Sequence, residues 1–290
     1  GGNARIILDA VVKYEVAKGT QLWFGQTKLP GNRERVVSSQ KLQFVDRSNV
    51  NSKFNIDRDF GFQLRHKLKL GEAVLLLKES VSLGEGRNVI VTDNGGLDFT
   101  GRIEFLPMGE FTDKGDYFSS DLKREETAKL AIAVTADFNQ GAIRQGGQLG
   151  KLLVDSSGAY IESDLTALFA DLMFKYNGFS VLAEVAYRES SLGDFRDYNG
   201  RAFRQGFGYT CQAGYLLKSN YEIAGRYTRI MPLSGLASDI KHTEQITAGL
   251  SKYFMGHNLK VQTDLTYERA LSTIFASDKL MFRLQTELSF

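Results

Sequence analysis

The sequence predicts an all-β fold, a transmembrane antiparallel β-barrel, and three observations lead to this prediction. Apolar and polar side chains alternate with a period of two, thirteen segments carry the alternation, and short connections alternate with long ones. Side chains on a strand point to opposite faces in turn, so each segment would separate an apolar medium from a polar one. A barrel of 290 residues is an ordinary size, and we expect a single domain over residues 1–290.

The alternation is clearest near the C-terminal end, where the run from Lys279 to Phe290 places leucine, phenylalanine and threonine on one face. Most of the thirteen segments have ten residues or more. Strands of soluble sheets have about five or six residues, whereas transmembrane strands need ~9 to 11 residues with this alternation. The alternative, a soluble sandwich that buries its apolar faces between two sheets, is therefore less favoured.

Composition excludes several other classes of protein. The 36 Lys and Arg residues nearly balance the 34 Asp and Glu residues, so no global basic field would attract a nucleic acid. The longest purely apolar runs have five residues, and a membrane-spanning helix needs ~20. A single cysteine, Cys211, cannot form an intrachain disulfide. The hydrophobic fraction of 42% argues against disorder.

The connections between segments are of two kinds. Tight turns such as Tyr176-Asn177-Gly178 alternate with long connections over residues 30–56, 84–96, 140–161, 189–205, 231–241 and 270–278. Outer-membrane barrels have short periplasmic turns and long extracellular loops, so the two kinds would mark the two sides of the membrane. Residues 106–126 break this rule, because they form a long connection on the short-turn side.

The parity of the strand count leads to a further expectation. The first segment, residues 4–16, and the last segment both end on the short-turn side. A barrel whose two ends lie in the periplasm has an even number of strands. Thirteen is odd, so we expect at least one strand upstream of Gly1, or a miscount by one between residues 84 and 126. The complete barrel would then have 14 to 16 strands.

Several short motifs lie between Gly25 and Asn139. They are Gly25-Gln26, Leu29-Pro30, Arg33-Glu34-Arg35, Phe44-Val45-Asp46-Arg47-Ser48, Asp57-Arg58-Asp59-Phe60-Gly61 and Gly109-Glu110-Phe111. These motifs resemble the phosphate-selective porin O and P family. The resemblance implies a sixteen-stranded, often trimeric channel with loops folded inward and basic side chains that conduct anions. The terminal Phe290 resembles the signal that the outer-membrane barrel assembly machinery reads.

The charges on the inward register nearly cancel. Thirteen basic and eleven acidic residues fall on this face, so strong anion selection cannot come from the wall as a whole. Cross-strand ion pairing that keeps the wall rigid is the simpler interpretation. The basic residues that we take as candidates for lining the lumen are Arg65, Lys67, Arg102, Arg226 and Arg283.

The connection over residues 30–56 has a different charge balance, with five basic residues against Glu34 and Asp46, a local excess of three positive charges. Arginine binds phosphate or carboxylate through two parallel hydrogen bonds, and rings of basic side chains select anions in pores. We expect this connection to fold into the lumen; a solvated surface loop or a partner-binding face is the alternative. The candidates for an anion-binding constriction are Arg33, Arg35, Lys41, Arg47, Lys53 and Arg58.

Signs of an enzyme are weak. The three histidines, His66, His242 and His257, have no evident Ser or Asp partner for a hydrolytic triad, and no His or Cys spacing suits a metal. We therefore expect no catalytic residues, no metal and no cofactor. The sequence predicts a bacterial outer-membrane porin for passive diffusion of small anionic solutes such as phosphate. The alternative is a non-conducting or plugged barrel whose long extracellular loops dock other outer-membrane proteins.

Overall fold

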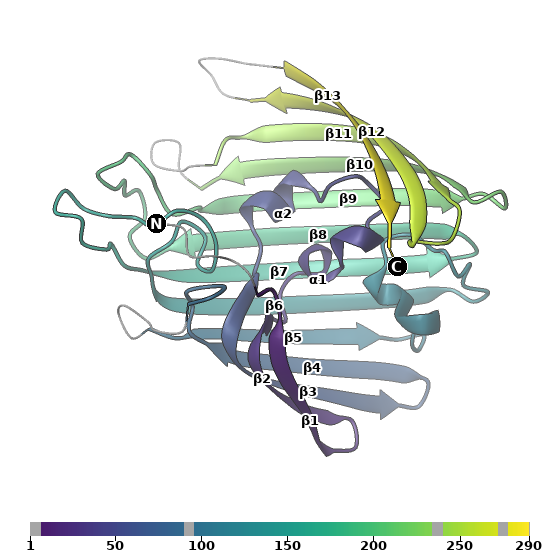
Figure 1. The fold of residues 1–290 in the computed structure, drawn as a ribbon, viewed down its shortest axis with the longest axis horizontal. Helices are drawn as coiled ribbons and strands as arrows, with labels where there is room; N and C mark the ends of the chain where they lie inside the picture. Colours follow the sequence, from purple (N-terminus) through teal and green to yellow (C-terminus); the bar gives the residue numbers. More distant parts are fainter. Residues whose placement is uncertain (1–6, 90–95, 234–239, 272–277, 290) are drawn as a thin grey trace.

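The computed structural model describes residues 7–89, 96–233, 240–271 and 278–289, and most of them belong to one antiparallel sheet (Figure 1). Its strands follow one another in chain order, each paired with its sequence neighbours. They are β1 Ala10–Ala17, β2 Thr20–Lys28, β3 Arg58–Leu70, β4 Ala73–Ser82, β5 Asp98–Leu106, β6 Lys129–Ala142, β7 Ser163–Tyr176, β8 Phe179–Ser190, β9 Gly206–Leu216, β10 Tyr221–Pro232, β11 Thr243–Tyr253, β12 Leu259–Ala270 and β13 Asp278–Leu288. The expected all-β fold with thirteen strands is confirmed.

In the part of the chain that the structure describes, helical structure is confined to four short elements between strands. The helices α1 Arg33–Val36 and α2 Asn49–Lys53, with the 3-10 turn η1 Ser39–Lys41, lie between β2 and β3. The turn η2 Thr112–Tyr117 lies between β5 and β6. No helix among the described residues is long and apolar enough to cross a membrane.

The sheet curls, and α1 and α2 lie in its hollow (Figure 1). We call the side that holds them the inner face. Among the described residues, β1 and β13 each pair with one strand only, so the sheet has two edges. The turns fit the sequence locally: Asn177 and Gly178 both have positive φ, as a two-residue hairpin turn requires, and they join Tyr176 directly to Phe179.

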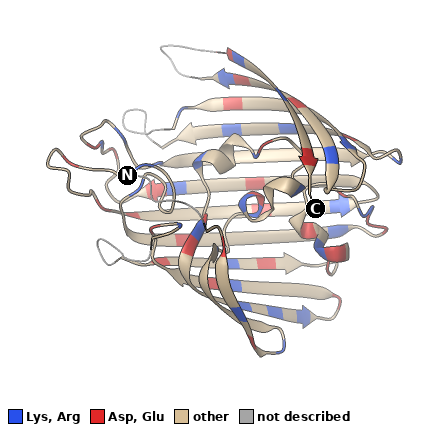
Figure 2. Cartoon of the chain, in the orientation of Figure 1, with Lys and Arg blue, Asp and Glu red and all other residues tan. Residues whose placement is uncertain are grey.

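Burial on the two faces is the reverse of that in a soluble sheet. On β5, Arg102 is 4% exposed and Glu104 is 1% exposed, while Ile103 between them is 52% exposed. The same order holds along the sheet, where Val134, Ile223 and Ile246 are exposed on the outer face. Polar and charged side chains are therefore buried on the inner face, and apolar side chains cover the outer face. Figure 2 shows that charges of both signs are spread along the strands.

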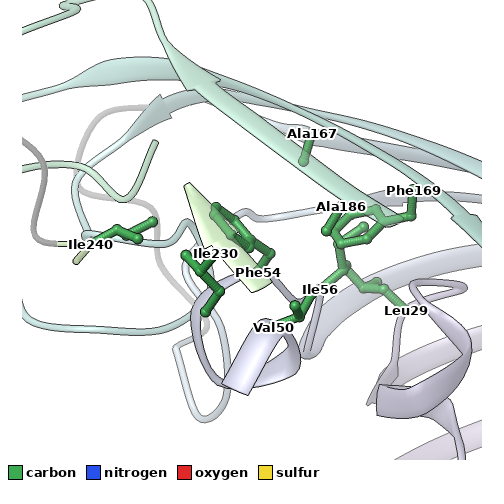
Figure 3. Packing of buried hydrophobic residues seen from close by; sticks show 9 residues of the cluster. All are labelled: Leu29, Val50, Phe54, Ile56, Ala167, Phe169, Ala186, Ile230 and Ile240. Carbon is green, nitrogen blue, oxygen red and sulfur yellow. The ribbon is translucent and has the colours of Figure 1, made fainter. Parts of the chain in front are cut away.

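Residues 29–57, which we call the inner segment, cover the middle of the inner face. Leu29, Val50, Phe54 and Ile56 of this segment pack with Phe169 of β7 and with its buried neighbours (Figure 3). Phe54 and Ile56 are 0% exposed. The inner face thus carries an apolar patch where the inner segment rests.

The connection between β5 and β6, residues 107–128, covers a second part of the inner face. Its Phe111 packs with Val74, Leu106 and Met173 in another buried apolar cluster. Its backbone also meets the inner segment, since the amide of Ser119 donates to the carbonyl of Lys41 at 3.0 Å. This long connection on the short-turn side is therefore a packed part of the fold.

Replacing Phe54 with Ala should loosen the inner segment, because a buried Phe→Ala change leaves a cavity and costs about 3–5 kcal/mol. The segment contains five Lys and Arg residues between Arg33 and Lys53, and trypsin should cleave there faster in the variant. Phe138→Ala, on the outer face and 38% exposed, is the control and should leave the cleavage rate unchanged. Equal cleavage of both variants would contradict the assigned packing.

Candidate functional site

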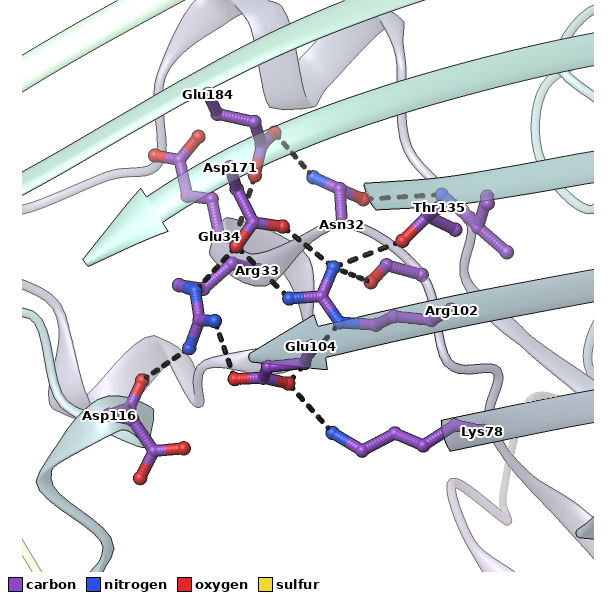
Figure 4. Close-up of polar contacts among 12 residues, drawn as sticks. Asn32, Arg33, Glu34, Lys78, Arg102, Glu104, Asp116, Thr135, Asp171 and Glu184 are labelled. Atoms are coloured by element: carbon purple, nitrogen blue, oxygen red, sulfur yellow. Dashed lines mark hydrogen bonds and ion pairs between the residues drawn. The ribbon is translucent and has the colours of Figure 1, made fainter. Parts of the chain in front are cut away.

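The inner segment is anchored to the sheet by α1 and the residue before it. Asn32, at the N-cap position of α1, does not cap the helix with its side chain; its Nδ2 donates instead to Oε1 of Glu184 on β8 at 2.7 Å. The backbone amide of Glu34 donates to the other oxygen of Glu184 at 3.0 Å. One carboxylate of the sheet thus holds the first turn of α1 (Figure 4).

Arg33 forms the centre of a buried ion-pair cluster. Its Nη2 lies 2.5 Å from Oε1 of Glu104 on β5, and its Nε lies 2.6 Å from Oδ1 of Asp171 on β7. Arg102 bridges the same two carboxylates, at 2.6 Å from Asp171 and 3.4 Å from Glu104, and Lys78 lies 3.0 Å from Glu104. Three cations therefore share two carboxylates on the inner face (Figure 4).

This cluster keeps the Arg33 guanidinium protonated and gives its nitrogen atoms hydrogen-bond acceptors. Burial by itself would lower the pKa of the guanidinium, but Glu104 and Asp171 outweigh that effect, and the pKa is raised. Nη1 donates to the backbone carbonyl of Asp116 at 3.2 Å, so the residue also joins the inner segment to the 107–128 connection. Its partners thus engage the Nε, Nη1 and Nη2 of a side chain that is 2% exposed.

Arg47 is a second arginine of the inner segment, with different partners. Its Nε and Nη2 donate to the carbonyl oxygens of Glu34 and Val37 at 2.9 and 2.7 Å. Within the described residues no carboxylate forms an ion pair with it. Burial, followed by the charge of nearby Arg35, lowers its pKa. The hydrogen-bond acceptors of Arg47 are therefore neutral carbonyl oxygens, and the carboxylates of Glu34 and Asp57 act on its charge through space.

A cavity of about 510 Å³ lies between the inner segment and strands β10–β13. Four arginines line it, namely Arg35, Arg47, Arg226 and Arg283, against one acid, Asp46. We call it the basic cavity. Arg35 is paired with Asp57 at 2.5 Å, and Arg283 with Asp264 at 2.7 Å and Asp46 at 3.0 Å.

A second cavity, of about 460 Å³, lies near the short turns and is lined by residues that include Lys41, Phe118, Lys175 and His257. Lys41 lines this cavity and the next residue, Leu42, lines the basic cavity. The carbonyl of Leu42 accepts from Lys260 on β12 at 3.1 Å. Lys41 and Leu42 thus lie between the two cavities, and a hydrogen bond joins Leu42 to the sheet.

The structure separates the six constriction candidates. Only Arg35 and Arg47 line the basic cavity. Arg33 is held in the ion-pair cluster, and the Lys41 ammonium lies 4.0 Å from the centre of the Phe118 ring. Lys53 ends α2, and Arg58 lies 3.0 Å from Asp9 near the β1 edge. Their role in binding anions stays a prediction.

The five lumen candidates also occupy different surroundings. Arg226 and Arg283 line the basic cavity, and Arg102 belongs to the ion-pair cluster. Arg65 stacks 3.6 Å from the centre of the Trp23 ring, and Lys67 lies 2.6 Å from Glu110. Phe290, taken as the assembly signal, lies outside the described residues.

Sequence reasoning missed the carboxylates that neutralise the inner segment. Glu104 and Asp171 are two of the eleven acids that the alternation places on the inward register, but nothing in their spacing points to Arg33, which is 71 and 138 residues away from them. The pattern Arg102-Ile103-Glu104 was the available signal, because it places two opposite charges side by side on the inner face. Within the described part of the chain, no group of three or more His, Cys, Asp or Glu side chains could hold a metal.

Replacing Arg33 with Met should destabilise the protein by about 3–5 kcal/mol, because it removes one partner from a buried ion pair. The matched control is Lys67→Met, which breaks a pair whose side chains are 38% and 50% exposed and should cost less than about 1 kcal/mol. Urea unfolding followed by tryptophan fluorescence measures both. Equal losses in the two variants would contradict the assigned role of the cluster.

The stability of the protein should decrease as the pH is lowered, partly because of His257, which is 8% exposed. Burial, then the charges of Lys260, Lys175 and Lys41, lower its pKa from 6.5 to about 3. Between these values the unfolded chain binds a proton that the folded protein does not, so stability is lost as the pH falls, by at most about 1.4 kcal/mol per pH unit. The free energy of unfolding of the His257→Gln variant should depend less on pH between these two pKa values than that of the unmodified protein. The same pH dependence in both proteins would show that His257 does not cause the loss of stability.

No family model and no curated protein matches the chain.

Proposed function

We propose that the chain is an outer-membrane β-barrel channel for passive diffusion of small anionic solutes. The observation that carries the proposal is the reversed burial, with charged side chains covered on the inner face and apolar side chains exposed on the outer face. Strands β2 to β13 have 9 to 14 residues, which is long enough, when tilted, to cross a hydrocarbon layer, and β1 has eight. An apolar outer face against lipid and a wet polar interior are what such a barrel requires.

Closure of the sheet is part of the proposal. An unpaired strand edge in lipid would leave backbone amides and carbonyls without partners, at several kcal/mol each. The edges at β1 and β13 therefore need further β-structure to bridge them in a membrane. The sheet is an antiparallel meander in which each strand pairs with its neighbours in sequence. Up-and-down barrels have the same arrangement of strands.

The basic cavity supports the choice of anions. The wall as a whole carries both signs, but four arginines and one aspartate surround this space. Arg47 has only neutral acceptors among the described residues, so its charge acts on whatever enters the cavity. A pore selects anions through such local clusters when binding is weak enough to let the ion leave.

A second function has an observation in its favour. The inner segment is fixed by an apolar cluster and by buried ion pairs, which favours a plugged barrel that docks other outer-membrane proteins. The long connections between β6 and β7 and between β8 and β9 also bond to each other, with the amide of Tyr198 donating to the carbonyl of Val154 at 3.1 Å. They form a preformed surface rather than separate loops.

Planar lipid bilayers with a salt gradient distinguish the two functions. The channel should give discrete conductance steps and a reversal potential shifted toward anions. Arg47→Gln should lower the chloride-to-potassium permeability ratio by up to about thirtyfold, because loss of one unit charge beside the path raises the energy of chloride and lowers that of potassium by about 1 kcal/mol each. Lys218→Gln, the same charge change at the exposed turn after β9, is the control. Absence of conductance together with stoichiometric co-purification of other chains would support the docking barrel instead.

A further inference from the structure

We propose that the basic cavity binds a hydroxylated organic anion, a phosphorylated or carboxylated monosaccharide, in preference to inorganic phosphate. As a statement about transported solutes this rests on the proposed function, but binding at the cavity can be measured without conduction. Three features of the cavity favour such a ligand: its size, two lining residues with buried donors that lack a protein partner among the described residues, and its mixture of charged, neutral polar and apolar side chains.

The size of the cavity exceeds the needs of a simple ion. A volume of about 510 Å³ lies within the range of pockets that enclose small organic ligands, ~300–1,000 Å³. An inorganic phosphate ion would contact one part of this wall and leave the remainder to water. A ligand of monosaccharide size can contact several sides at once.

Two buried donors in the wall lack a protein partner. Nδ2 of Asn51 and Nε of Arg226 have no hydrogen-bond partner among the described residues, and these side chains are 2% and 5% exposed. A buried donor without an acceptor costs about 1–3 kcal/mol, so an oxygen-rich ligand gains by supplying one. Both residues line the cavity, Asn51 from α2 and Arg226 from β10, where the Arg226 guanidinium also stacks 4.5 Å from the centre of the Phe44 ring.

The positive charges that line the cavity would attract an anionic group. Arg47 is bonded to neutral carbonyls, and Arg226 donates to the carbonyl of Asp46 at 2.8 Å while its nearest acid, Glu34, lies 3.9 Å away. The carboxylate of Asp46 is 68% exposed and pairs with Arg283. A phosphate or carboxylate group near Arg47 and Arg226 would therefore lie among four lining arginines and one lining carboxylate, that of Asp46.

The rest of the wall suits a hydroxylated carbon skeleton. Asn49, Asn55, Gln245 and Thr266 line the cavity with neutral groups that can donate and accept. Leu42, Val45, Leu149 and Met281 line it with apolar surface. Sugar hydroxyls need the first set and the sugar carbon atoms need the second, whereas inorganic phosphate uses neither fully.

Calorimetric titration of the purified protein in detergent tests this inference with three probes: glucose 6-phosphate, inorganic phosphate and glucose. We expect glucose 6-phosphate to bind at least about tenfold more tightly than inorganic phosphate, which corresponds to one additional good hydrogen-bonding contact, and glucose to bind weakest. Similar affinities for glucose 6-phosphate and inorganic phosphate would overturn the inference.

Variants at Asn51 locate the site. Asn51→Asp has nearly the same shape but replaces a donor with a negative charge, and it should weaken glucose 6-phosphate binding at least about tenfold. Asn51→Ala should weaken it a few-fold and serves if the aspartate variant fails to fold. Asn199→Asp, in an exposed connection, is the control and should leave the affinity unchanged. Unchanged affinity in both Asn51 variants would overturn the assignment.

The two proposals fail in different ways. If the protein binds glucose 6-phosphate tightly but conducts no ions, the binding site is supported and the channel function is contradicted. If the protein conducts anions but binds inorganic phosphate as tightly as glucose 6-phosphate, the channel function is supported and the preference for organic anions is contradicted.

Discussion

Charged side chains that are buried need partners, and this requirement governs the inner face of the sheet. A strand with period-two alternation turns every second side chain inward, and many of those side chains are ionisable. Removing a charge from water costs several kcal/mol unless another charge and hydrogen bonds compensate it. The inner segment supplies those partners, so the sheet and the segment depend on each other.

The compensation joins parts of the chain that are far apart in sequence. Arg33 meets Glu104 and Asp171, and Glu184 holds the first turn of α1. These contacts have directional geometry and few alternatives, whereas the apolar cluster around Phe54 supplies non-directional attraction. The two kinds of contact act together: the apolar cluster favours association of the segment with the sheet, and the ion pairs select one placement.

The excess of positive charge in the inner segment is distributed unevenly. Arg33 is neutralised by the sheet, and Arg35 by Asp57 in the same connection. Arg47 keeps its charge beside the basic cavity. In the proposed channel, anion preference therefore arises between the inner segment and β10–β13, and a nearly neutral wall is compatible with it.

The thirteen strands, their alternation and the order of short and long connections can be predicted from the amino-acid sequence, because they depend on local periodicity and turn chemistry. The sequence also placed Arg102, Glu104 and Asp171 on one face, since the face of a strand residue follows from its parity. It could not distinguish Arg33 from Arg47, which lie in one connection and have the same chemistry. The pairing of Arg33 and the place of Arg47 and Asn51 beside a cavity are seen in the three-dimensional structure alone. The physical reason is that the partners of a side chain depend on how far each strand is shifted against its neighbours and on where the inner segment rests, and these are sums over long-range contacts that no local pattern encodes.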